Sequence, residues 1–198
     1  MAIPLDPTDA LEADRALVCA VLAREPWAFN QLVRQYQGLV WHVVDRMVRH
    51  PEDTRELCQD VFLRIHRSLH QYRGESALKA WIAQVAYSVA LRHLERRRIP
   101  IIEDTGDDEA GSLAGRVADG FDLEATMAND ESARHLHAAL AALPPLQRTL
   151  LTLYHLEEMS IGDITHITGL AEGTIKSHLF RSRKRLRAIL ETRMGVPA

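Results

Sequence analysis

The stretch SIGDITHITGLAEGTIKSHLFRSRKRLR, residues 160–187, contains two helical patterns separated by a very short turn. Ser160 with Asp163 predicts a capping box at the start of the first helix. Gly169 predicts its end, because glycine readily takes a positive φ. A second, longer helix begins after a three-residue turn. This arrangement predicts a helix-turn-helix, whose second helix enters the major groove of DNA.

The second helix has an apolar face and a basic face. Four residues fall on its inner side, namely Ile175, Leu179, Ser182 and Leu186. From Lys176 through Arg187 there are six bases and no acid, which attracts phosphates. A merely solvated face would not explain an exposed Phe180. We expect base contacts from Lys176, Ser177, Phe180 and Arg181, and phosphate contacts from Arg183, Lys184 and Arg187.

Apolar residues recur at helical spacing along most of the chain, which predicts an all-α fold of two small helical domains. The first domain, residues 9–98, should hold four helices: Asp9–Ala23, Pro26–Val48, Pro51–Leu69 and Ser76–Arg98. The second domain, residues 131–192, should hold helices over residues 131–142, 145–157, 160–168 and 172–191. Residues expected to be buried include Phe29 and Val33 in the second helix, and Val85 and Val89 in the fourth.

An acidic, glycine-containing linker is expected over residues 99–130. Residues 103–131 hold ten acidic side chains and one base, Arg116, while the whole chain has a formal charge of −3. The rest of the chain therefore carries +6 (−3 minus −9), which suits a nucleic-acid binder. The linker's acidity has two interpretations: it keeps the protein soluble, or it imitates nucleic acid in a polymerase channel.

Composition argues against an enzyme, a metalloprotein or a membrane protein. The longest apolar run, Ala16–Ala23, is far shorter than the roughly 20 residues that span a bilayer, so we expect a cytoplasmic protein without membrane insertion. Cys19 and Cys58 are expected to be small buried hydrophobes. The pairs His66 with His70 and His135 with His137 lack a partner carboxylate in a metal-binding motif, so we expect surface histidines. No cofactor, metal or catalytic residue is predicted.

Two longer stretches resemble one family. Residues 140–186, LAALPPLQRTLLTLYHLEEMSIGDITHITGLAEGTIKSHLFRSRKRL, resemble region 4 of bacterial sigma factors. Residues 56–98, ELCQDVFLRIHRSLHQYRGESALKAWIAQVAYSVALRHLERRR, are similar to sigma region 2. The compact arrangement is that of the extracytoplasmic-function type. The resemblance implies partners: RNA polymerase core enzyme, promoter DNA, and an anti-sigma factor or other regulator.

The resemblance also implies roles for both halves. Region 2 would bind core polymerase and open the −10 element, and region 4 would read the −35 element. Core-binding residues are expected on the third helix, at Glu56, Gln59, Asp60 and Arg64. The −10 residues are expected in a loop and on the fourth helix, at Tyr72, Arg73, Glu75, Ser76, Trp81, Gln84, Ser88 and Arg92. The loop, with Gly74, would capture a flipped base; for Trp81, ordinary core packing stays an alternative.

Two departures from the family pattern bear on function. The family often carries Asn where this chain has Ser88, so the −10 sequence read differs from the commonest one. Where the family commonly shows Asp-Ala-Glu-Asp, this chain has Asp53-Thr54-Arg55-Glu56, which replaces an acid with a base. Weaker core affinity is one consequence, and a phosphorylation switch at Thr54 is another hypothesis.

The main rival hypothesis is a helix-turn-helix regulator that acts without binding core polymerase. It explains the C-terminal half equally well. It does not explain the Tyr-Arg-Gly loop followed by the Trp-Ile-Ala helix and the basic run Arg96, Arg97 and Arg98. The sequence therefore favours a sigma factor.

Overall fold

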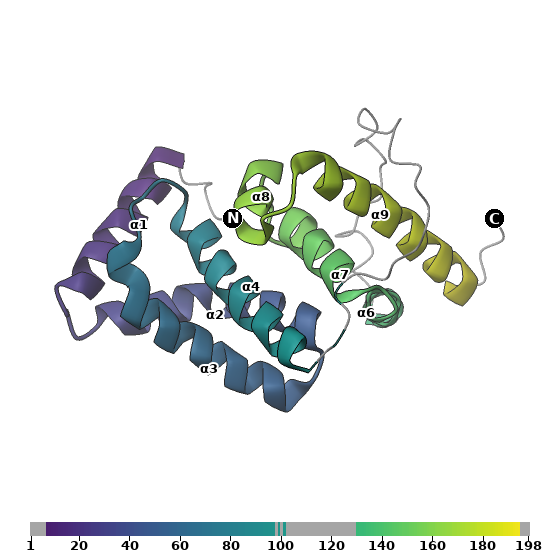
Figure 1. Ribbon diagram of the computed structural model, residues 1–198, viewed down its shortest axis with the longest axis horizontal. Helices are drawn as coiled ribbons and strands as arrows, with labels where there is room; N and C mark the ends of the chain where they lie inside the picture. Colours follow the sequence, from purple (N-terminus) through teal and green to yellow (C-terminus); the bar gives the residue numbers. More distant parts are fainter. Residues whose placement is uncertain (1–6, 98, 100, 102–129, 195–198) are drawn as a thin grey trace. The chain divides into compact units, whose positions relative to one another are not determined.

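The computed structural model describes residues 7–97, 99, 101 and 130–194, and every regular element in these ranges is helical (Figure 1). The all-α expectation is confirmed. The chain divides near His93 into two compact units. The predicted linker, residues 99–130, lies almost wholly outside the described residues, as does Arg98.

The first unit is a helical bundle in which the long helices α2 and α3 run antiparallel (Figure 1). Its elements are α1 (Pro7–Leu22), α2 (Ala28–Val48), α3 (Pro51–Ser68), the 3-10 turn η1 (Leu69–Gln71) and α4 (Leu78–Arg96). The helix bounds agree with the sequence prediction to within about two residues at each end, which is the usual variation in where a helix is taken to begin and end. α2 packs mainly on α3, and α1 contacts both α2 and η1.

The turn between α2 and α3 is set by local hydrogen bonds. Arg49 takes a left-handed conformation with φ 56°, and its N–H donates to the Asp45 carbonyl at 3.0 Å. The Nδ1 of His50 accepts from the Asp53 N–H at 3.4 Å, and Pro51 occupies the first turn of α3. Proline suits that position because its missing N–H would have no helical partner. These contacts end α2 and start α3 within three residues.

The core of the first unit differs from the predicted stripes on three helices. On α3, Phe62 was expected to be buried but is only half-buried. On α2, Phe29 and Val33 are only half-buried. On α4, Val85 and Val89 are also half-buried, whereas Leu78 and Ile82 are fully buried as predicted. The rest of the buried row is Ala80, Ala83, Ala86, Tyr87, Ala90 and Leu94. The prediction was wrong for the two valines because this helix is apolar around most of its circumference, so periodicity does not select one face.

The second unit contains α6 (Asp130–Ala141), α7 (Pro145–Leu151), η2 (Thr152–Leu156), α8 (Ile161–Thr168) and α9 (Glu172–Met194). One helix was expected from Pro145 to Glu157, but its last turn is π-helical. There the Glu157 N–H donates to the Thr152 carbonyl, five residues back, at 2.9 Å. Such short π segments interrupt helices and often occur at functional sites.

The corner between α6 and α7 is closed by a buried arginine. Arg148 is 6 % exposed, and its Nη1 donates to the Leu143 carbonyl at 2.6 Å and to the Ala141 carbonyl at 3.4 Å. Ala141 ends α6 and Leu143 lies in the turn that follows, so the guanidinium supplies hydrogen bonds to carbonyls at and just beyond the helix end. α9 packs on both α6 and α7. These hydrogen bonds therefore help to set the relative positions of α6 and α7, the two helices on which α9 packs.

Among the helices of the described ranges, none combines the length and apolarity needed to cross a membrane.

Candidate nucleic-acid and polymerase interfaces

The helix-turn-helix has the geometry that the sequence predicts. The Asp163 N–H donates to Ser160 Oγ at 3.1 Å, and the Ser160 N–H donates to Asp163 Oδ2 at 3.2 Å. Gly169 ends α8 with φ 74°, and its N–H donates to the Thr165 carbonyl at 2.8 Å. A side chain at this φ would be strained, so glycine is required for the turn. The capping box and the glycine turn are confirmed.

α9 presents one face to the core of its unit. The four residues expected inside, Ile175, Leu179, Ser182 and Leu186, are all buried. Four of the expected DNA-binding residues, Lys176, Ser177, Phe180 and Arg181, are partly exposed in the first turns of the helix, and Lys184 and Arg187 are exposed further along it. The outer face thus carries a phenyl ring among cations.

Arg183 does not join that surface. It was expected to contact phosphates, but it is 6 % exposed, and its Nε donates to the Leu179 carbonyl at 3.3 Å. His178 is also buried, and its Nδ1 has no hydrogen-bond partner. The two residues extend the inner stripe of α9 on either side. A helix wheel could not separate them from the outer face, because both lie at the border between the faces.

An acid was missed at the start of α9. Glu172 Oε2 lies 3.2 Å from Lys176 Nζ, one helical turn away; Glu172 is exposed and Lys176 is partly exposed. A second pair joins Arg187 Nε to Glu191 Oε1 at 3.3 Å. Exposed pairs of this kind stabilise a helix by only about 0.3–0.5 kcal/mol, so neither prevents its cation from contacting DNA.

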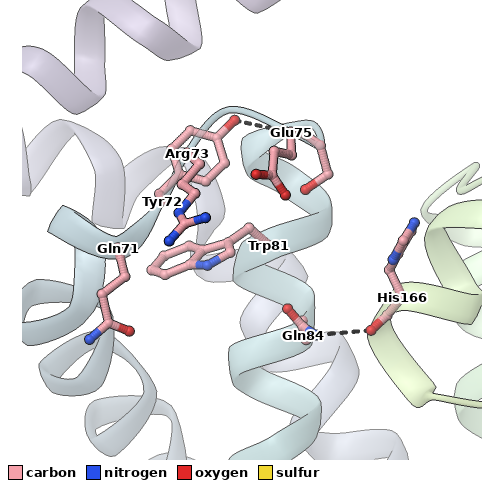
Figure 2. A pocket seen from close by; sticks show the side chains of 8 residues that line it. Gln71, Tyr72, Arg73, Glu75, Trp81, Gln84 and His166 are labelled. Atoms are coloured by element: carbon pink, nitrogen blue, oxygen red, sulfur yellow. Dashed lines mark hydrogen bonds between the residues drawn. The ribbon is translucent and has the colours of Figure 1, made fainter.

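The loop before α4 forms a small aromatic site (Figure 2). The Tyr72 hydroxyl donates to the Ser76 carbonyl at 2.6 Å, which closes the loop across Gly74, a glycine with φ 73°. The rings of Tyr72 and Trp81 have centroids 5.7 Å apart and are tilted by 57°. The residues that line this hollow include Gln71, Tyr72, Arg73, Glu75, Ser76, Trp81 and Gln84. Of these, Gln71 was not predicted.

The site continues along one side of α4. Trp81 and Ser88 are partly exposed, and Gln84 and Arg92 are exposed, at spacings that place them on adjoining turns of one helix face. Partial exposure means that Trp81 is not an ordinary core residue. Burial, followed by the charge of Asp14, raises the pKa of Tyr72, while Arg15 opposes this effect. The phenol is therefore neutral near pH 7, and its ring can stack on a base.

The expected polymerase-binding residues lie on the solvent side of α3. Glu56, Gln59, Asp60 and Arg64 are exposed, whereas Leu57, Val61 and Ile65 on the opposite side are buried. Leu63 is 54 % exposed next to Arg64 and was not predicted.

Thr54 does not fit a phosphorylation switch in the folded protein. Its side chain is fully buried, and its hydroxyl has no hydrogen-bond partner. A kinase needs the hydroxyl in solvent, and a phosphate at this position would be buried without compensation. The hypothesis of a switch at Thr54 is therefore wrong for this fold.

The remaining cysteine and histidine predictions had mixed outcomes. Cys19 is exposed, contrary to expectation, because it lies on the outer side of α1. Cys58 is half-buried, and burial together with the charge of Asp45 raises its pKa to about 11. His66, His70 and His137 are exposed, as expected of surface histidines. Within the described ranges, no three His, Cys, Asp or Glu side chains are grouped so that they could hold a metal ion.

Comparison with known families now adds to this geometry. Residues 32–99 match the model of sigma-70 region 2, and residues 133–186 match that of sigma-70 region 4. The RNA polymerase sigma-H factor of Pseudomonas aeruginosa is 31% identical over 183 residues, which cover 91% of this chain and 95% of the relative. The ECF RNA polymerase sigma-E factor of Haemophilus influenzae is 33% identical over 174 residues, covering 86% and 92%. The chain belongs to the sigma-70 family, in its extracytoplasmic-function class.

This sigma factor also shares its fold with solved structures. CnrH, solved in complex with the cytosolic domain of CnrY, aligns with a TM-score of 0.63 at 20% identity, over 91% of this chain and 98% of CnrH. The sigma factor RpoE, solved with the anti-sigma factor NepR from Bartonella quintana, aligns with a TM-score of 0.61 at 21% identity, over 83% and 98%. As a sigma factor, the protein directs promoter-specific transcription initiation by RNA polymerase. A regulator that lacks polymerase binding is disfavoured, because region 2 is present.

We expect the second unit of this sigma factor to lose stability in mild acid. Burial, then the positive charge of Arg181, lowers the pKa of His178, and burial, then Arg183, lowers that of His155. Both histidines are neutral in the folded unit, whereas the unfolded chain binds protons below about pH 6.5. Stability is therefore full above that pH and falls as the pH decreases below it. Thermal denaturation of the full chain between pH 8 and pH 5.5 measures this loss.

His178→Leu should weaken this pH dependence, since it removes one of the two neutral buried groups. The exposed His137 provides the control, and His137→Gln should keep the wild-type pH profile. A pH profile for His178→Leu identical to wild type would show that this histidine does not contribute.

Proposed function

We propose that this sigma factor uses three surfaces, one that binds core polymerase and two that recognise promoter DNA. The exposed side of α3 contacts core polymerase, the loop at residues 71–76 with α4 opens the −10 element, and the outer face of α9 reads the −35 element. The protein acts as a cytoplasmic DNA-binding subunit and not as an enzyme. The observation that carries the proposal is the Tyr72 and Trp81 pair, since an open aromatic pair beside polar groups has no role in a helical core.

The geometry of the loop supports base capture. Its backbone is held by the bond from the Tyr72 hydroxyl to the Ser76 carbonyl, so the tyrosine ring is presented in one orientation. A base leaving the duplex loses its stacking neighbours, and an aromatic surface replaces them. Gln84 and Arg92 are exposed along α4 and supply hydrogen-bond donors for the separated strand.

The burial pattern of α9 supports duplex reading. Its inner stripe is packed on α6 and α7, so its outer face is held in a fixed orientation. Side chains in the first turns of a recognition helix reach base edges, and those further along meet the backbone. We therefore assign base contacts to Lys176, Ser177, Phe180 and Arg181, and phosphate contacts to Lys184 and Arg187. Arg183 is left out because it is buried.

An inhibitory protein partner is a further part of the proposal. RpoE, whose fold this chain shares, is held by an anti-sigma factor in its solved structure. We propose that an anti-sigma factor also binds this chain. Its surfaces include exposed apolar side chains at Leu22, Trp27, Trp41 and Leu63, which would be available to a protein partner.

Core binding should depend on the exposed side of α3. The double substitution Asp60→Ala with Arg64→Ala removes two exposed polar groups and leaves the buried row intact, so we expect weaker holoenzyme assembly and an unchanged melting temperature. Binding to core enzyme is measured by fluorescence anisotropy of the labelled sigma factor. The control is Arg34→Ala with Gln37→Ala on exposed positions of α2. Equal affinity for wild type and the α3 variant would remove this surface from the proposal.

Promoter opening should depend on Tyr72. Loss of one stacking contact with a base costs about 1–3 kcal/mol, so Tyr72→Ala should reduce the open complex by roughly 5-fold to 150-fold. Tyr72→Phe keeps the ring and should retain most activity. Permanganate reactivity of unpaired thymines measures opening. If Tyr72→Ala opens promoters as well as wild type, the loop does not capture the base.

Duplex reading should separate two residues of α9. Arg181→Ala should cost about 1–3 kcal/mol at the preferred −35 sequence and relax selectivity. Lys184→Ala should weaken preferred and scrambled sequences alike and reduce the salt dependence by about one phosphate contact. Affinities of holoenzyme for the two duplexes, measured over a range of salt concentrations, test both. An equal loss on both duplexes for Arg181→Ala would exclude base reading by this residue.

A further inference from the structure

A partly buried hydrogen bond joins the first helix, α1, to α2. The Tyr36 hydroxyl on α2 donates to Asp14 Oδ1 on α1 at 2.7 Å, and the same hydroxyl accepts from Gln35 Nε2 at 3.1 Å. Tyr36 is only 6 % exposed. A hydrogen bond from a buried hydroxyl to a carboxylate is short and directional, so it fixes one helix against the other. α1 itself lies outside the matched range of region 2, residues 32–99.

The helix that carries Asp14 also contacts the turn before the loop at residues 71–76. α1 contacts η1, the turn that leads directly into Tyr72. Burial raises the pKa of both tyrosines, Asp14 adds to this effect at each of them, and Arg15 on the next position opposes it at Tyr72. The hydrogen bond between Tyr36 and Asp14 therefore holds the helix that contacts η1, and η1 leads into the loop.

We propose that Asp14 and Tyr36 are positioning residues for the loop at residues 71–76, so that α1 takes part in promoter opening. The inference rests on the proposed role of Tyr72 in capturing a base. The hydrogen bond sets the position of α1, and α1 supports η1 and the first residue of the loop. A supported loop binds the base without first losing conformational freedom, which is the general advantage of a preorganised site.

The proposal predicts a specific ranking of variants. Asp14→Ala removes the acceptor, and Tyr36→Phe removes the donor while keeping the ring, so both should slow promoter opening by roughly tenfold. Asp14→Asn keeps an oxygen that accepts from the tyrosine and should open promoters at nearly the wild-type rate. Glu12→Ala, at an exposed position of the same helix, is the control and should change nothing.

A double-mutant cycle with Tyr72→Ala distinguishes positioning from general destabilisation. Open-complex formation by holoenzyme is followed by permanganate reactivity, well below the lowest melting temperature in the set. If Asp14 acts through the loop, Asp14→Ala should cause little further loss once Tyr72 is absent. Affinity for the −35 duplex should be the same in all variants.

Three results would overturn the inference: an equal loss from Asp14→Ala in both backgrounds, no loss from Asp14→Ala in the wild-type background, or an Asp14→Asn variant as slow as Asp14→Ala. The proposed function fails separately. If Tyr72→Ala opens promoters normally, the role assigned to the loop is wrong. If Tyr72→Ala is defective but Asp14→Ala is not, only the role assigned to α1 is wrong.

Discussion

The packing of α2 against α3 is the contact on which the first unit depends. Leu32, Val40, Val43 and Val44 on α2 are fully buried, as are Val61 and Ile65 on α3. Burying side chains of this size stabilises a fold by about 1.5–3 kcal/mol each, before the entropy of ordering the chain is subtracted. Because these residues occupy the inner side of α3, its polar side chains must face solvent. The end of α3 also determines where the loop with Tyr72 emerges.

Buried polar groups specify the details that this apolar packing leaves open. In the first unit, Tyr36 bonds to Asp14 across two helices. In the second unit, Arg148 bonds to the last carbonyls of α6 and fixes the corner with α7. An apolar contact permits a helix to slide or rotate by a small amount, whereas a buried hydrogen bond with one acceptable geometry does not. Hydrogen bonds of this kind lie behind both surfaces proposed to bind the promoter: Tyr36 with Asp14 behind the loop, and Arg148 behind α9.

Sequence reasoning was most reliable where a local rule has one structural outcome. Ser160, Asp163 and Gly169 each have a strong preference at a helix end, so the helix-turn-helix could be placed to the residue. The aromatic loop was placed through the family resemblance, and the structure brings Tyr72 and Trp81 together. Neither the hydrogen bond from Tyr36 to Asp14 nor the exposure of Leu63 has a local signal, because both depend on how helices distant in sequence pack.

The errors have physical causes of the same kind. Val85 and Val89 were misplaced because α4 is apolar on most sides, and the alanines that allow close packing carry little periodic signal. Arg183 was misplaced because its charge suggested solvent, while its position on the border of the inner stripe allows the side chain to reach the Leu179 carbonyl. The π-helical turn after Leu151 is a tertiary effect, since nothing in TLYHL distinguishes it from an α-helix.

The division of α9 into two faces has a consequence for how such proteins diversify. The stripe through Ile175, Leu179, Ser182 and Leu186 keeps the helix in place, and the residues proposed to touch base edges are not part of it. Under the proposed assignment, substitutions on the outer face would alter the preferred −35 sequence at little cost in folding free energy. After a gene duplication, two copies could acquire separate sets of target genes through a few changes in the first turns of one helix, while both keep the same polymerase.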